Sequence, residues 1–166
     1  MNGVNIRFIL LLVIQIILSS VLNLSQFVML TILPTMILFL PTEKNTESTL
    51  FLAFAVGLIT DFLSNGMIGL TAASILPVAF ARTFVMRLIF GSELFVRNDN
   101  LSISRQGLPK IFTAILILTA IFLFTFILLE SSGTRRLSLC AIKFAASLLL
   151  SSGLSIFAAN ILRSNS

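Results

Sequence analysis

The chain has 166 residues, of which 57% are hydrophobic and only 10% charged, and its formal net charge is +5. Soluble domains carry about 25% charged residues, so this composition excludes a water-exposed globular fold. In lipid the backbone must satisfy its own hydrogen bonds, which leaves helices or closed barrels. Continuous apolar runs favour helices over the alternating pattern of a barrel. The sequence therefore predicts an all-α, polytopic transmembrane bundle that forms a single integral membrane domain.

One helical crossing of a membrane needs about 20 apolar residues. By this measure, the successive apolar runs predict about six membrane spans. The first predicted span covers residues 6–22. Arg7 at the start of this span and two serines near its end mimic a signal peptide. No cleavage site follows, so we expect the helix to be retained. The second span, 27–40, is short and contains Pro34, which removes a backbone donor and can kink a helix.

The remaining predicted spans cover residues 48–62, 67–90, 109–129 and 137–162. The longest polar stretch, residues 93–108, separates the fourth and fifth spans and is long enough for at most a surface helix. An even number of crossings places both termini on one side of the membrane. Most basic residues fall on that side, so we expect both termini to be cytoplasmic.

The residue types that are missing limit the chemistry. The chain has no histidine, which is the commonest metal ligand and a frequent general base. Its single cysteine, Cys140, lies in an apolar stretch and cannot form an internal disulfide. We therefore expect no enzyme activity, no metal and no cofactor. The basic residues flank apolar runs, which indicates contact with anionic lipid head groups and not with nucleic acid.

Two ionisable residues are expected at membrane depth, where a charge is costly and usually has a partner or faces water. Asp61 follows an apolar run, and Lys143 lies about two turns into the last span, at a similar predicted depth. The matched depth predicts an Asp61–Lys143 ion pair. Alternatively, Asp61 is wetted at its helix end or contacts a partner protein, and Lys143 snorkels to the interface. The competing charged partners are Glu130, Arg135 and Arg136.

Arg82 and Arg87 both lie near the end of the fourth span. They are separated by about 500° of helical rotation and do not share a face. Arg87 is expected to snorkel to lipid phosphates. The deeper Arg82 either faces protein or a partner, or snorkels to the interface as well.

Small residues recur at every fourth position of the last span. Such rows let helices approach closely in lipid. The row serves either packing within this protein or the docking of a partner's transmembrane helix. Its members are Ser147, Ser151, Ser155 and Ala159.

Residues 57–70, GLITDFLSNGMIGL, resemble the pattern of the MreD family of rod shape-determining membrane proteins. That pattern is a glycine, an aspartate on the following turn, and a short turn that ends in Gly-Leu before another apolar helix. The matching positions are Gly57, Asp61, Gly66 and Gly69. The chain length, the apolar segments, Pro34 and the basic loop after the fourth span also fit.

The resemblance implies a non-enzymatic scaffold of the cell-elongation machinery in the bacterial inner membrane. MreD-like proteins act with MreC, a single-span periplasmic partner, and with the MreB filament. They also associate with RodA and its transpeptidase partner in peptidoglycan synthesis. The resemblance further implies a fold like the substrate-binding component of ECF vitamin transporters. A small-solute component of that kind is the alternative function, although the spans offer few polar residues for a vitamin site.

Overall fold

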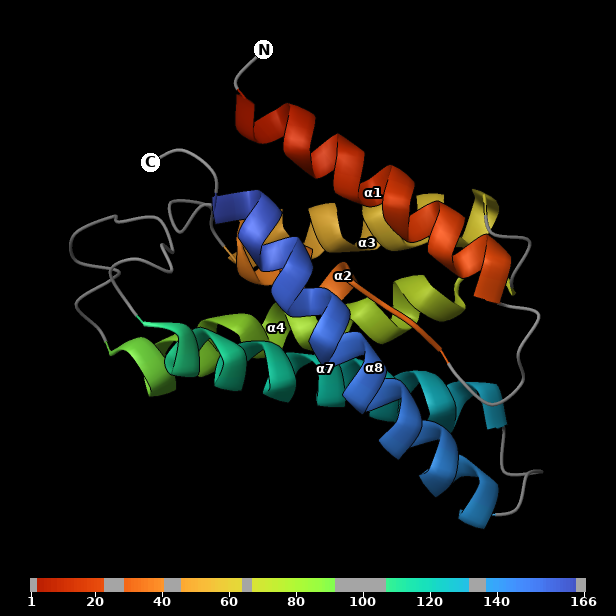
Figure 1. Cartoon of the computed structure of the whole chain (residues 1–166). Helices are drawn as coiled ribbons and strands as arrows, with labels where there is room; N and C mark the ends of the chain where they lie inside the picture. The colour runs from red at the N-terminus through yellow and green to blue at the C-terminus, as the bar shows by residue number, and fades with distance from the viewer. Residues whose placement is uncertain are drawn as a thin grey trace.

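The structure is a computed structural model that describes residues 3–22, 29–40, 46–63, 67–91, 107–131 and 137–163. All regular structure in these residues is helical, which confirms the predicted helical class for this part of the chain (Figure 1). The helices are α1 (Gly3–Leu22), α2 (Leu33–Leu38), α3 (Thr46–Leu63), α4 (Leu70–Phe90), α7 (Leu108–Ser131) and α8 (Leu137–Arg163).

In the part of the chain that the structure describes, four segments are long and apolar enough to cross a membrane, namely Thr46–Leu63, Leu70–Phe90, Pro109–Ser131 and Cys140–Ala159. Large apolar side chains cover the outside of these helices; Phe51, Phe80 and Leu149 are 77%, 71% and 72% exposed. In water such a surface would drive association, but lipid accepts helices that are apolar all round. The chain is therefore a multi-pass membrane protein.

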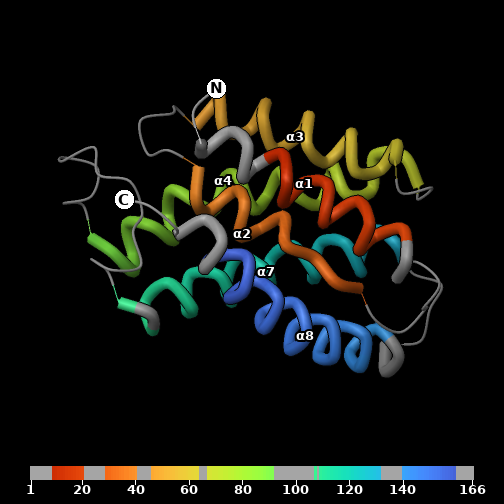
Figure 2. The backbone as a smooth tube through the Cα atoms, turned by 45° about the horizontal axis from the view of Figure 1, so that its top comes forward, coloured from red at the N-terminus to blue at the C-terminus, as the bar shows by residue number. Residues whose placement is uncertain are grey.

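The helices pack around the short α2. This helix contacts α1, α4, α7 and α8, and all six of its residues are buried. Figure 2 shows α2 between these longer helices, with α3 and α8 towards opposite sides of the bundle. In Figure 1, α1 begins and α8 ends at the same end of the bundle. The chain thus returns to its starting end, as an even number of crossings requires.

The segment that follows α1 differs from the spanning helix predicted for residues 27–40. Its described part is a non-helical stretch, residues 29–32, followed by α2. We call residues 29–32 the strap; in Figure 1 it runs nearly straight into α2. Pro34 lies in the first turn of α2, where a missing N–H costs little, and does not kink a longer helix. The predicted helix is therefore wrong over residues 29–32, because the strap finds its hydrogen-bond partners in distant helices; residues 27 and 28 lie outside the described residues.

Candidate functional site

Asp61 caps the N-terminus of α4 from the end of the neighbouring helix α3. It is 3% exposed, and its carboxylate accepts hydrogen bonds from the backbone N–H groups of Gly69 at 2.9 Å and of Thr71 and Ala72 at 3.1 Å. The first N–H groups of a helix have no acceptor within that helix. A carboxylate in this place supplies the acceptor and also interacts favourably with the helix dipole.

Two glycines make this junction between α3 and α4 fit. A Cβ at Gly57 would lie 2.6 Å from the Cα of Ala72, so any side chain there would push the helices apart. Gly69 has a φ of 92°, a left-handed conformation that favours glycine, and its N–H is one of the donors to Asp61. Three motif positions therefore build one junction, whereas Gly66 lies outside the described residues.

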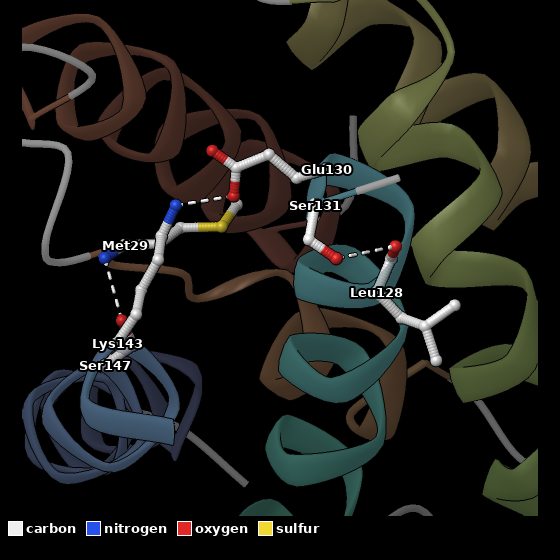
Figure 3. Close-up of polar contacts among 6 residues, drawn as sticks. All are labelled: Met29, Leu128, Glu130, Ser131, Lys143 and Ser147. Carbon is white, nitrogen blue, oxygen red and sulfur yellow. Dashed lines mark hydrogen bonds and ion pairs between the residues drawn. The ribbon is translucent and has the colours of Figure 1, made fainter. Parts of the chain in front are cut away.

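The predicted Asp61–Lys143 ion pair is wrong. Lys143 Nζ lies 2.5 Å from Glu130 Oε2, in the last turn of α7 (Figure 3). It also lies 6.0 Å from the centre of the Phe126 ring. Lys143 is 9% exposed, so it is turned into the protein and not towards the interface. Equal depth could not identify the partner, because residues at one depth face different neighbours around a bundle. Glu130 thus links α7 to α8, while Arg135 and Arg136 lie outside the described residues.

Serine side chains of α8 hold the beginning of the strap. The Met29 N–H donates to Ser147 Oγ at 2.8 Å, a contact drawn in Figure 3, and the Thr31 N–H donates to Ser151 Oγ at 3.1 Å. Ser151 Oγ donates in turn to the Met29 carbonyl at 3.3 Å. Non-helical backbone is tolerated at membrane depth only where protein or water satisfies its polar groups. The serines meet this requirement for part of the strap.

Gln15 of α1 holds the end of the strap. Its Oε1 accepts a hydrogen bond from the Ile32 N–H at 2.6 Å, and its Nε2 donates to Ser19 Oγ at 2.9 Å. The side chain is 0% exposed. Sequence reasoning missed Gln15, although a lone amide within an apolar run is a usable signal, since such groups bond across helices.

The small-residue row of α8 faces inward. Ser147, Ser151 and Ser155 are 0% exposed and Ala159 is 2% exposed. Packing within this protein is therefore the correct interpretation of the row, and a partner helix cannot reach it. The outward positions of α8 include Ala141, Ala145, Leu149 and Gly153.

Arg82 caps the C-terminal end of α2. It is 4% exposed; its Nε donates to the Leu38 carbonyl at 3.4 Å, and its Nη2 donates to the Leu40 carbonyl. The last carbonyl groups of a helix have no N–H donor within the helix. A cation beside them also interacts favourably with the negative end of the helix dipole. Arg82 therefore faces protein, as one of its two interpretations predicted. Arg87 is exposed on another side of α4.

The buried polar groups of the described ranges hold helices together. Within those ranges, no group of three or more His, Cys, Asp or Glu residues could hold a metal ion. Cys140 carries a half-buried free thiol. Asp61 and Arg82 each satisfy a helix end, and Lys143 and Glu130 join two helices.

Comparison with known proteins gives no match to a family model, to a curated protein or to a solved structure. A functional proposal therefore depends on the sequence of residues 57–70 and on the geometry of Gly57, Asp61 and Gly69.

Proposed function

We propose that the chain is a non-enzymatic, MreD-like scaffold of the bacterial cell-elongation machinery in the inner membrane, with both termini in the cytoplasm. In this role it connects MreC and, directly or indirectly, the MreB filament with RodA and its transpeptidase partner in peptidoglycan synthesis. An ECF-like arrangement of the bundle is part of the proposal.

The α3–α4 junction is the observation that carries this proposal. Gly57, Asp61 and Gly69 are the positions that resemble the family pattern, and all three are needed for the same local geometry. Gly57 permits the close crossing of α3 and α4, Asp61 caps the N-terminus of α4, and Gly69 adopts the left-handed conformation of the turn. This shared purpose supports reading the spacing as a motif and not as a chance result of apolar composition.

The outward side of α8 is the place where we expect a single-span partner such as MreC to pack. The small residues Ala141, Ala145 and Gly153 are exposed on this side, so little side-chain volume covers the helix backbone there. A Cβ at Gly153 would meet nothing within 4 Å. Small side chains allow the close backbone approach that favours helix association in lipid.

Affinity purification from native membranes tests the proposal. The wild-type chain is expected to recover MreC, RodA and the transpeptidase, and its depletion is expected to abolish rod shape. Recovery of none of these proteins would reject the scaffold function. Gly153→Leu is expected to reduce MreC recovery, with Ala73→Leu on the exposed side of α4 as the matched control. Full MreC recovery with Gly153→Leu would reject the α8 surface alone.

A small-solute component resembling the ECF substrate-binding subunit is the second candidate. Three buried hydroxyl groups favour it, because Thr35, Thr119 and Ser155 have no hydrogen-bond partner and a polar solute would supply one. Thermal stabilisation of the purified chain by a vitamin, together with no recovery of MreC, would place this function first.

A further inference from the structure

The strap depends on distant residues for its conformation. Its N–H groups bond to Ser147 and Ser151, which follow their partners by 118 and 120 residues, and to Gln15. The following helix α2 has six residues, whereas an isolated helix needs about 12–15 to be even marginally stable in water. Met29 and Thr31 lose their hydrogen-bond acceptors once the strap leaves α8.

The helices on the other side of the bundle have stronger ties. Asp61 joins α3 to α4 through three N–H groups, and Gly57 permits direct backbone contact between them. The apolar windows of α7 and α4 are 50% and 44% buried, whereas those of α3 and α8 are each 28% buried. The Asp61 cap and the Gly57 contact hold α3 to α4 despite its lower burial. Local opening occurs where few contacts must be broken, which favours the boundary between the strap and α8.

The register of the strap leaves one serine of α8 without a partner. Met29 and Thr31 bond to Ser147 and Ser151, because two residues of extended chain advance about as far as one helical turn. The same register would bring the Leu33 N–H to Ser155, but that N–H donates to Thr31 Oγ1 at 3.3 Å. The Ser155 hydroxyl therefore stays buried and unpaired.

Buried hydroxyl groups without a partner lower the stability of the closed arrangement. Among the described residues, Thr35 on α2, Thr119 on α7 and Ser155 on α8 have buried hydroxyls with no hydrogen-bond partner. A buried polar group without a hydrogen bond destabilises the packed state. The closed arrangement of α2 and α8 is therefore less stable than one in which the hydroxyls of Thr35 and Ser155 find partners.

We propose that the strap is a movable segment, which separates from α8 while α3, α4 and α7 remain packed. The ion pair between Lys143 and Glu130 keeps the beginning of α8 on α7 during this motion. Figure 3 shows the pair beside the Met29–Ser147 contact, so the fixed point adjoins the contact that breaks. This inference is independent of the proposed function.

Thiol reactivity of the full-length protein in detergent micelles tests the proposal. In a Cys140→Ala background, Thr31→Cys reports on the strap and Ala79→Cys reports on α4; both positions are buried. The reagent is an apolar coumarin maleimide. Ser147→Ala combined with Ser151→Ala removes both acceptors that α8 supplies to the strap and leaves Gln15 of α1 in place. Ser152→Ala is the matched control, because the Ser152 hydroxyl donates to the Leu149 carbonyl of its own helix at 2.8 Å.

The thiol at position 31 is expected to react faster than the thiol at position 79 in the parent chain. The double serine variant is expected to raise the rate at position 31 roughly tenfold, since two buried donors lose their acceptors, and to leave position 79 protected. Ser152→Ala is expected to match the parent. Equal rates at position 31 in the double variant and in Ser152→Ala would overturn the proposal. Equal acceleration at positions 31 and 79 would also overturn it, because the bundle would then open as one unit.

Discussion

Replacing Asp61 with alanine removes the acceptor for the backbone N–H groups of Gly69, Thr71 and Ala72. Each hydrogen bond to a charged group contributes about 1.5–3 kcal/mol, and the three are not additive because they share one carboxylate. We therefore expect Asp61→Ala to lower the free energy of unfolding by about 3–5 kcal/mol. Asp61→Asn keeps one carbonyl oxygen and loses the charge at the helix N-terminus, so we expect a loss of about 1–2 kcal/mol.

Unfolding of the purified protein by sodium dodecyl sulfate, followed by circular dichroism, measures these losses. Glu47→Ala is the matched control, because Glu47 is an exposed acid in the first turn of the same helix and its removal should change stability by less than about 0.5 kcal/mol. Two results would refute the capping role of Asp61. One is a loss for Asp61→Ala no larger than that for Glu47→Ala, and the other is an equal loss for the alanine and asparagine variants.

The same titration checks three further predictions. Gly57→Ala should cost about 1–3 kcal/mol because its Cβ meets the α4 backbone, whereas Gly153→Ala has open space and should be neutral or slightly stabilising; the reverse order would contradict the close crossing. Arg82→Met should cost about 2 kcal/mol by removing the donor of the Leu38 and Leu40 carbonyl groups, and Arg82→Lys should cost less; equal losses would show that a cation has no value there. A double-mutant cycle of Lys143→Met and Glu130→Gln should give a coupling of about 1 kcal/mol, and zero coupling would reject the ion pair.

The long helices could be predicted because their signal is local. Continuous apolar runs between polar stretches define α1, α3, α4, α7 and α8, and the expected spans differ from the observed helices by a few residues. The inward direction of Arg82 could also be inferred, since a charge deep in a span needs protein around it.

The strap could not be predicted because its stabilising groups lie elsewhere in the chain. Residues 27–40 are apolar and resemble a short spanning helix, and nothing within them specifies the serines of α8 or Gln15 as partners. The same limitation explains the wrong ion pair. The apolar pattern indicates how deep Lys143 lies in its span. The direction in which its side chain points depends on how α8 packs on α7, and this packing brings Glu130 beside Lys143.

The role of the small-residue row of α8 could likewise not be read from the sequence, because it depends on which segment packs against the row. A serine at every fourth position suits either a partner helix or an internal contact. Only the position of the strap shows that Ser147 and Ser151 serve as acceptors for backbone N–H groups inside the protein.

Backbone chemical shifts of the protein in lipid bilayers test most directly whether the segment that follows α1 contains a non-helical strap. Solid-state NMR of isotope-labelled protein reports Cα and Cβ shifts, which distinguish helical from extended residues. The structure predicts non-helical shifts for Met29 and Thr31 and helical shifts within α2 (Leu33–Leu38). Helical shifts that continue without interruption from residue 29 to residue 38 would contradict the strap and its hydrogen bonds to α8.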